Sequence, residues 1–376
     1  MHPQSRPRLT PAVADVRRAV RLALGAVENG AVKNGAVDSG AVENSGHPSV
    51  RAADPAAPHG AVNRTPEFST GALVLVALSG GPDSLALAAA TAFEAPRASL
   101  RAGAVIVDHA LQAGSAEVAA AAAAQARELG LDPVIVRAVA VGTDGGPEAA
   151  ARSVRYAALE AAAVETGASL VLLGHTLDDQ AETVLLGLAR GSGANSLHGM
   201  AESTAASAGV AYARPLLGIR RATTLQFCAD SGITPWTDPQ NSDPAFARVR
   251  VRTTVLPMLE RELGPGIAEA LARTADQLRE DSDALDHFAE EIAEELADLA
   301  ESGISLPVRA LASNPPALRQ RLIRLAVQSE FHVSLSRSQT LEVARLVTDW
   351  HGQKPLDLPG VRVERQGGLL IFSARE

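Results

Sequence analysis

The chain has 376 residues, 46% of them hydrophobic, and a formal net charge of −9. Its length predicts two domains, and its single cysteine, Cys228, excludes an internal disulfide and a multi-cysteine metal site. No run approaches the roughly 20 apolar residues of a membrane-spanning helix, and residues 1–10 lack the apolar core of a secretory signal, which favours a cytoplasmic protein without a membrane partner.

The N-terminal region combines a short periodic segment with a repeat. Residues 10–24 open with a capping residue and a proline and space their apolar residues three and four apart. A glycine then recurs every five residues, and a stretch rich in proline and alanine follows. Such a composition cannot bury enough apolar surface to offset chain entropy. We therefore predict an N-terminal amphipathic helix within residues 1–24 and a disordered low-complexity insertion over 25–67 without a catalytic role.

From residue 73 onward, apolar strands alternate with helices. Continuous apolar strands separated by helices are typical of a parallel sheet covered on both faces. Ligands bind such sheets at the carboxyl ends of the strands. The pattern predicts an α/β domain over residues 68–218. Its predicted strands are 73–78, 103–107, 133–137 and 169–173, and its predicted helices are 84–94, 115–129, 148–166 and 177–190.

The alternation then stops, and the pattern predicts a second, mainly helical region over 219–376 with a terminal β-hairpin. Two stretches, 211–261 and 305–354, are rich in arginine and flank an acidic stretch, 276–301. The basic stretches suit a phosphodiester backbone; the opposing interpretation, which the negative net charge favours, is ordinary solvated surface. The predicted helices are 219–231, 247–263, 266–300, 316–330 and 336–350.

The first strand leads directly into the segment Ser79-Gly80-Gly81-Pro82-Asp83-Ser84. Two glycines allow a tight backbone turn, and the start of the next helix presents unpaired N–H groups to an anion. No lysine follows, which excludes a Walker-type loop. Asp83 suits a phosphate site only if a metal ion lies between the charges. The alternatives are a pyrophosphate-binding loop and an ordinary turn with helix-capping serines.

Two more polar groups follow along the same domain. Asp108 and His109 come directly after the second strand, where a helix cap is the alternative interpretation. Arg152, Arg155 and Tyr156 occupy adjacent positions of the helix over 148–166. Arginine offers a planar fork for phosphate or carboxylate, although a solvent-facing helix with ion pairs would also explain the pattern.

The richest cluster follows the fourth strand. His175, Asp179 and Glu182 lie four and three residues apart, so they share one face of a helix. Two carboxylates and an imidazole beside a phosphate site can hold magnesium, orient an amine or accept its proton. Helix capping would explain Asp178 or Asp179, and it leaves the histidine and the glutamate unexplained.

These motifs resemble the PP-loop ATP pyrophosphatases, which share the S-G-G-x-D-S signature. The run from Gly174 to Gly193, G-H-x-x-D-D-Q-x-E-T-x-L-L-x-L-x-R-G-S-G, is similar to the tRNA(Ile)-lysidine synthetase branch of that family, as is Arg214-Pro215-Leu216-Leu217. The likeness covers 71–263 strongly. PP-loop enzymes that thiolate tRNA use paired cysteines, and one cysteine cannot supply that pair. The resemblance implies an adenine nucleotide alpha hydrolase-like domain followed by a mainly helical one.

The resemblance also implies a ligase that uses ATP and Mg2+. It would adenylate the C2 oxygen of the wobble cytidine in tRNA(Ile) with a CAU anticodon, and the amine of L-lysine would then displace AMP to give lysidine. It suggests a homodimer. The implied nucleotide-binding residues are Ser79, Gly80, Gly81, Pro82, Asp83, Ser84, Asp108, His109, Arg152 and Gly174, with Asp83 near the metal. The implied catalytic residues are Asp83, Asp179 and Glu182, which would manage metal and amine, and Arg155, His175 and Arg214, which would grip phosphate or cytidine.

Two other functions stay open at this point. One is an ATP-dependent amide-forming enzyme such as NAD synthetase, against which the segments 190–193 and 214–217 argue. The other is a non-catalytic tRNA-binding protein that keeps a nucleotide fold, against which the acids at 83, 178, 179 and 182 argue.

Overall fold

The computed structural model describes residues 9–28, 71–109, 114–140, 142, 147–191, 193–205, 209–296, 298–300 and 303–375. The chain forms two compact units, Met1–Asp276 and Gln277–Glu376. This division by contacts differs from the functional boundary predicted at 218/219, which stays a prediction. Of the predicted insertion, residues 25–28 belong to the first helix, α1 (Pro11–Glu28), and 29–67 lie outside the described residues.

Unit 1 is built on a six-stranded sheet with the order β3-β2-β1-β4-β6-β5. All neighbouring pairs are parallel except β5 with β6, so the predicted parallel sheet is confirmed. The last two strands were not predicted, because three residues are too few to show a pattern. The strands are β1 (Leu73–Ala77), β2 (Arg101–Asp108), β3 (Val134–Ala138), β4 (Leu170–Leu172), β5 (Ser203–Ala205) and β6 (Ala211–Ala213).

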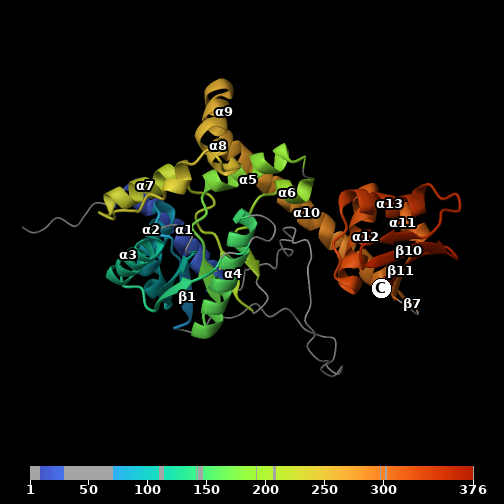
Figure 1. Cartoon of the computed structure of the whole chain (residues 1–376), viewed down its shortest axis with the longest axis horizontal. Helices are drawn as coiled ribbons and strands as arrows, with labels where there is room; N and C mark the ends of the chain where they lie inside the picture. The colour runs from blue at the N-terminus through green and yellow to red at the C-terminus, as the bar shows by residue number, and fades with distance from the viewer. Residues whose placement is uncertain are drawn as a thin grey trace, which may run out of the picture. The chain divides into compact units, whose positions relative to one another are not determined.

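Helices cover both faces of this sheet (Figure 1). Val74 and Val76 of β1 pack in one core with apolar residues of α1, α2, α3 and α7. Leu73 and Leu75 point to the other face and pack against α4, because successive strand residues alternate between faces. Burial on both faces explains why the strands are continuously apolar. The covering helices are α2 (Pro82–Glu94), with the short η1 (Ala95–Ala98) after it, α3 (Ser115–Glu128), α4 (Pro147–Thr166) and α7 (Arg221–Asp230).

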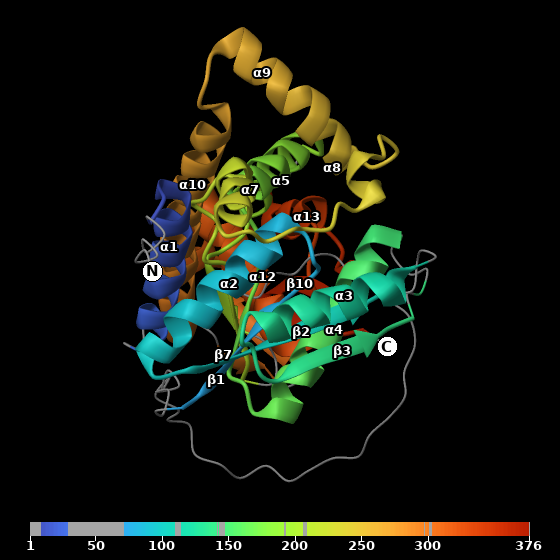
Figure 2. The same cartoon turned by 90° about the vertical axis from the view of Figure 1, so that its left-hand side faces the viewer.

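A third apolar cluster joins α5 to the segment that follows α7. Leu177 and Ala181 pack against Val251, Leu256 and Ala268. The predicted helix 247–263 is interrupted by one π-helical turn, and its last part, α9, stands away from the sheet (Figures 1 and 2). The elements are α5 (Leu177–Ala189), α6 (Ala194–Leu197), η2 (Pro239–Ser242), α8 (Ala247–Arg250), η3 (Val251–Val255), α9 (Leu256–Leu263) and α10 (Ile267–Leu296), whose residues after Asp276 belong to unit 2.

Unit 2 packs helices against a five-stranded antiparallel sheet with the order β7-β8-β11-β10-β9. The predicted terminal hairpin is confirmed, with Gly367 and Gly368 at positive φ in its turn. The predicted helix over 266–300 is wrong at its end, because residues 298–300 form a strand. Its elements are β7 (Asp298–Ala300), β8 (Gly303–Pro307), α11 (Val308–Ser313), α12 (Pro316–Phe331), α13 (Arg337–Thr348), β9 (Leu356–Leu358), β10 (Val361–Gln366) and β11 (Leu369–Ala374). None of the described helices is long and apolar enough to cross a membrane.

Candidate active site

The segment between β1 and α2 forms a compact loop held by serine hydroxyls. The Ser84 hydroxyl donates to the Gly81 carbonyl at 3.0 Å, accepts from the Ser79 backbone N–H at 3.2 Å and lies 3.1 Å from the Ser79 hydroxyl. Gly80 has a φ of 82°, which favours glycine. Its carbonyl accepts a hydrogen bond from the Trp236 N–H at 2.9 Å. The loop leads directly into the first turn of α2, and the first N–H groups of a helix have no partner within it, as an anion site requires.

Gly174, at the end of β4, lies directly against this loop. A Cβ atom there would lie 3.2 Å from backbone atoms of Asp83 and Ser84, tighter than most real Cβ contacts, so glycine favours the close approach of the two segments. The adjacent Thr176 caps α5 in a reciprocal capping box with Asp179. The close approach of β4 to the loop places the start of α5, with its acidic residues, beside the start of α2.

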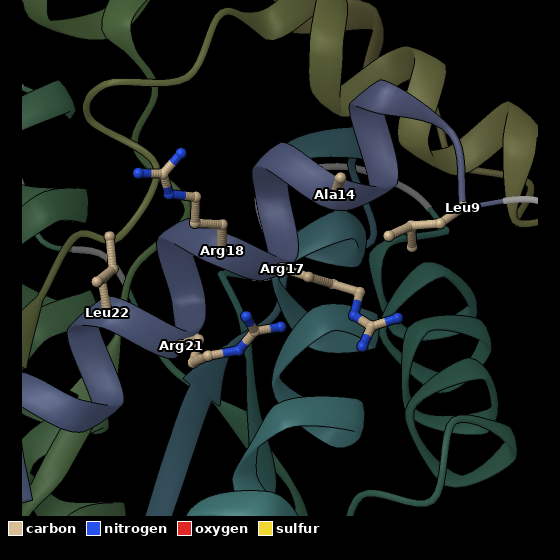
Figure 3. A pocket seen from close by; sticks show the side chains of 6 residues that line it. All are labelled: Leu9, Ala14, Arg17, Arg18, Arg21 and Leu22. Carbon is tan, nitrogen blue, oxygen red and sulfur yellow. The ribbon is translucent and has the colours of Figure 1, made fainter.

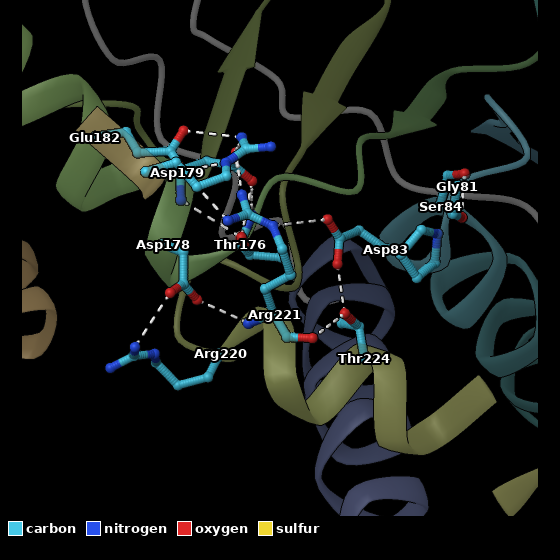
Figure 4. Close-up of polar contacts among 12 residues, drawn as sticks. Gly81, Asp83, Ser84, Thr176, Asp178, Asp179, Glu182, Arg220, Arg221 and Thr224 are labelled. Atoms are coloured by element: carbon cyan, nitrogen blue, oxygen red, sulfur yellow. Dashed lines mark hydrogen bonds and ion pairs between the residues drawn. The ribbon is translucent and has the colours of Figure 1, made fainter. Parts of the chain in front are cut away.

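Arg221, the first residue of α7, joins the acidic side chains of this region (Figure 4). Its guanidinium lies 2.7 Å from Asp179 Oδ1, 3.2 Å from Glu182 Oε1 and 3.5 Å from Asp83 Oδ2. Its backbone N–H donates to Asp178 Oδ2 at 2.7 Å. Sequence analysis missed Arg221 as a site residue. Its only signal was membership of the arginine-rich stretch 211–261, which does not show what the arginine contacts.

More arginines complete the neutralisation of these acids. Arg252 donates to both oxygens of Glu182, at 2.7 and 3.0 Å, and Arg248 Nε lies 3.6 Å from Glu182 Oε2. Glu182 is completely buried. We define the acidic cluster as four acids and three arginines: Asp83, Asp178, Asp179, Glu182, Arg221, Arg248 and Arg252. Each of its four carboxylates contacts an arginine of the cluster.

The surroundings shift the pKa values of two of these acids in opposite directions. Burial opposes ionisation of Asp179, but the Arg221 guanidinium and the Thr176 backbone N–H hold its pKa below the ordinary value. Burial raises the pKa of Asp83, and the Thr224 hydroxyl, which donates to Oδ1, and the Arg221 guanidinium only partly oppose it. Asp83 is thus the acid that a further positive charge would stabilise most clearly.

A second group, the basic cluster, comprises His109, Arg152, Arg155, His175 and Arg214 around Tyr156. Four of its nitrogen atoms are shielded from solvent and have no hydrogen-bond partner among the described residues. A buried donor without a partner costs about 1–3 kcal/mol. The four atoms are His109 Nδ1, Arg155 Nε, His175 Nδ1 and Arg214 Nε.

Like charges and burial act on the pKa values of this cluster. Burial lowers the pKa of His175 to about 3; the charge of Asp179 opposes this shift, and the Arg155 and Arg214 guanidiniums add to it. The imidazole is therefore neutral at physiological pH. Burial also lowers the pKa of Arg155. The cluster therefore disfavours further positive charge, and a bound anion would reduce the repulsion among its cationic side chains.

Tyr156 lies among the arginines of the cluster. Arg152 and Arg214 each donate to its hydroxyl at 3.4 Å, and its ring meets that of Tyr212 edge to face with centroids 5.2 Å apart. Burial would raise the pKa of Tyr156, but the charges of Arg152 and Arg214 outweigh this and lower it. Arg214 is fixed further by a 2.8 Å hydrogen bond to the Ala201 carbonyl.

The structure therefore brings the predicted residues together in two groups beside one loop. Asp83, Asp179 and Glu182 lie in the acidic cluster, and Arg152, Arg155, His175, Arg214 and His109 in the basic cluster. Asp108 ends β2 next to His109. The roles assigned to these residues from the sequence stay predictions. What the geometry adds is the contrast between acids that are paired with arginine and basic side chains that each keep a shielded nitrogen without a partner among the described residues.

Asp83 is the residue to test for a metal ion. No group of three or more His, Cys, Asp or Glu side chains in the described ranges is placed to hold a metal. Mg2+ is usually held by one or two carboxylates together with substrate phosphates and water. A single carboxylate beside an anion-binding loop therefore fits a magnesium ion that is bound together with a nucleotide.

Two surface hollows near α1 do not coincide with this chemistry. One, of about 360 Å³, is lined by residues of α1 and Leu9 (Figure 3), and the other, of about 530 Å³, lies between α1 and α7. Neither is lined by a predicted site residue. We locate the candidate site where shifted pKa values and unpartnered donors converge, because such groups mark functional sites more directly than volume does.

Comparisons with known proteins match two regions of the chain. Residues 60–259 match the model of a PP-loop domain, and residues 306–370 match the TilS substrate binding domain. The chain is 64% identical over 319 residues to the tRNA(Ile)-lysidine synthase of Leifsonia xyli subsp. xyli, across 85% of this chain and 92% of that protein. It is 53% identical over 311 residues to that of Thermobifida fusca, across 82% and 94%.

A solved structure with the same fold is the U34-tRNA thiolase NcsA from Methanococcus maripaludis with its [4Fe-4S] cluster. The TM-score is 0.52 at 18% identity, over 72% of this chain and 79% of that one. At this level of identity the similarity supports the fold alone.

Proposed function

Because this chain belongs to the tRNA(Ile)-lysidine synthase family, we propose that it joins L-lysine to C2 of the wobble cytidine of CAU-anticodon tRNA(Ile), through an adenylated tRNA intermediate and with release of AMP and pyrophosphate. The family, the fold class and the class of enzyme, a ligase forming a carbon–nitrogen bond, agree with the sequence predictions and are confirmed. The reaction steps, L-lysine, Mg2+, a homodimer and a cytoplasmic location belong to the proposal.

One observation carries the mechanism: the acidic cluster beside the loop at 79–84 adjoins a basic cluster whose shielded nitrogens lack partners among the described residues. In the first step, the loop and the N-terminus of α2 would hold the β- and γ-phosphates of ATP as pyrophosphate departs. Asp83 would hold Mg2+, which when bound neutralises charge that develops on the leaving group. The Ser84 hydroxyl, already directed along the loop, keeps the turn in this shape.

The basic cluster would take the α-phosphate and the cytidine. Arg155 and Arg214 each have a shielded Nε without a partner, and arginine is the side chain best suited to phosphate. Neutral His175 can form a hydrogen bond without adding a further positive charge. Its low pKa makes it a poor general base, so it orients the reacting groups.

The acidic cluster would receive L-lysine in the second step. This amino acid carries two ammonium groups and one carboxylate, and the cluster offers carboxylates and guanidiniums within a few ångströms of each other. Asp179 and Glu182 would bind the side-chain ammonium of L-lysine and assist its deprotonation. An arginine of the cluster would pair with the carboxylate of L-lysine. The amine then attacks C2 and AMP leaves.

Mass analysis of nucleosides tests the proposal directly. The purified chain is incubated with ATP, Mg2+, L-lysine and an unmodified CAU-anticodon tRNA(Ile) transcript, and the digest is searched for lysidine. We expect lysidine together with AMP and pyrophosphate in equal amounts. Reactions without L-lysine, or with a transcript whose wobble base is uridine, are the controls.

Two results would contradict the proposal. Pyrophosphate release that depends on a small carboxylic acid instead of the tRNA would identify an amide-forming enzyme. Binding of the tRNA without any ATP-dependent pyrophosphate exchange would identify a non-catalytic tRNA-binding protein. Sedimentation or light scattering of the purified chain separately tests the homodimer.

A further inference from the structure

Helix α12 of unit 2 carries two arginines on adjacent turns, one paired with an acid and one without such a partner among the described residues. Arg321 donates to Asp286 Oδ1 at 2.5 Å and to the Ser282 hydroxyl at 3.1 Å. Arg324 follows three residues later, so it lies on the same side of the helix. It is half-buried, yet it has no hydrogen-bond or ion-pair partner in the part of unit 2 that the structure describes. The nearby acid, Asp286, is already paired with Arg321.

Arg324 cannot easily leave this environment. Its neighbours Leu322, Ile323 and Val327 are completely buried in the core of unit 2, so the rotation of α12 is fixed. Burial and the charge of Arg321 lower the pKa of Arg324, the charge of Asp286 opposes this shift, and the charge of Arg337, the first residue of α13, adds to it. A half-buried cation among like charges destabilises the free protein. Packing alone gives no reason for an arginine here.

Another arginine of the same helix, Arg319, has a structural role and makes the hydrogen bonds that Arg324 lacks. Arg319 uses its donors on backbone carbonyls, from Nε to Leu311 at 2.9 Å and from Nη2 to Asn314 at 2.8 Å. These bonds tie α12 to the end of α11. Arg324 makes no such bond, so its donors are available to a ligand.

We propose that Arg324, together with Arg321 and Arg337, binds a backbone phosphate of the substrate tRNA. This inference rests on the proposed function. The forked guanidinium matches a phosphate, and the stretch 305–354 around the cluster holds seven basic residues against three acids. Contacts to phosphate position an RNA without reading its sequence. The cluster therefore contributes affinity and register to tRNA binding.

The test variant is Arg324→Met, which keeps an apolar stem of similar length and removes the charge. Its binding to an unmodified CAU-anticodon tRNA(Ile) transcript is measured by anisotropy from 50 to 200 mM KCl. We expect the Kd to rise about 5- to 10-fold and the slope of log K against log salt to fall by roughly 0.7 to 1, the loss of one phosphate contact. We expect the melting temperature to stay equal or to rise, and ATP binding to stay unchanged.

Arg309→Met is the matched control, because Arg309 is an exposed arginine of α11 in the same unit and its loss changes the net charge equally. Its Kd should change less than twofold. Arg324→Lys, which keeps the charge and loses the fork, should retain most of the salt slope and recover part of the affinity.

Three results would overturn the inference. They are an Arg324→Met protein that binds tRNA like the wild type, equal losses in Arg324→Met and Arg309→Met, and a melting temperature that falls in parallel with tRNA binding. Failure of the proposed function is distinguishable, because there the wild-type chain itself would form no lysidine. If the wild type forms lysidine and Arg324→Met binds tRNA normally, only this inference fails.

Discussion

The acidic cluster and the basic cluster lie in the same unit and differ in how their charges are satisfied. Every carboxylate of the first contacts an arginine, and Glu182 receives bonds from both Arg221 and Arg252. In the second, four shielded nitrogens of arginines and histidines lack a hydrogen-bond partner among the described residues. The carboxylates of the first cluster are all paired with arginine, where Arg248 Nε is the one shielded nitrogen described without a hydrogen bond, and the second cluster leaves several cationic side chains with unused donors.

This difference separates stability from function. Breaking a buried ion pair leaves an uncompensated charge and costs about 3–5 kcal/mol, so changes in the acidic cluster should damage the fold and the activity together. Removing a cation that has no partner leaves no such charge. Changes in the basic cluster should therefore reduce activity while the fold stays equally stable or becomes more stable, as expected of functional sites.

The largest effect is expected for Glu182→Gln. It removes the buried negative charge that Arg252 and Arg221 share and leaves Asp179 as the acid that contacts both, so the free energy of unfolding should fall by about 3 kcal/mol. Lysidine formation at saturating ATP should fall at least about 100-fold, which corresponds to roughly 2.7 kcal/mol of transition-state stabilisation. Denaturant unfolding and initial rates measure the two effects.

A matched control lies at Glu94, which is 1% exposed and pairs with Arg17 and Arg21, at 2.8 and 2.9 Å, between α2 and α1. Glu94→Gln should reduce stability without reducing the rate per folded molecule. Equal losses of rate in Glu94→Gln and Glu182→Gln would show that the acidic cluster acts only through stability.

Arg155→Met tests the basic cluster. Because Arg155 Nε has no partner and burial lowers the pKa of the guanidinium, we expect an unchanged or higher melting temperature. The rate of ATP-dependent pyrophosphate release with tRNA should fall about 100-fold, as is typical when one donor to a developing charge is lost. Arg152→Met, which removes an exposed arginine of the same helix, should lose less. A clear drop in the melting temperature of Arg155→Met would contradict the contrast between the clusters.

His175 should make stability depend on pH in a direction set by its pKa. That pKa is about 3 in the folded chain, below the ordinary 6.5, so protons bind the unfolded chain more readily. The contribution of neutral His175 is complete above about pH 6.5 and is lost as the pH falls toward 3, by about 2 kcal/mol at pH 5. His175→Asn should lose less stability than the wild type between pH 7 and pH 5. Titration of the His175 ring signals between pH 5 and 8 would contradict the prediction.

The smallest effect concerns Glu94 at lower pH. The Arg21 and Arg17 guanidiniums hold its pKa below the ordinary value, so its stabilising contribution is present above the unfolded pKa. That contribution is lost as the pH falls through the folded pKa. The difference in stability between wild type and Glu94→Gln, roughly 1–2 kcal/mol at pH 7, should therefore shrink as the pH falls below the ordinary glutamate pKa and through the lower folded one. A difference that stays constant with pH would mean that Glu94 acts by packing alone.

Local patterns in the sequence were sufficient for the main features of unit 1. The apolar runs of β1, β2 and β4 and the turn after β1 are each specified within a few neighbouring residues, since hydrophobic periodicity and glycine conformations are local properties. Strand β7 was missed because it lies at the end of a predicted helix, 266–300, whose acidic, alanine-rich sequence favours a helix. In the structure residues 298–300 pair with β8, a contact that the local sequence does not show. The strands β5 and β6 were missed because each spans only three residues.

The residues of the candidate site were also visible in the chain, because histidine, arginine and acids at helix spacing follow the strand ends. Their pairing was not. Arg221 lies 39 residues from Glu182 and 42 from Asp179, and Arg252 lies 70 from Glu182. The sequence by itself determined the sheet, the loop and the set of charged groups. Only the tertiary structure decided which charges neutralise each other and which stay unpartnered, because electrostatic energy depends on distance in space and on burial, and neither follows from separation along the chain.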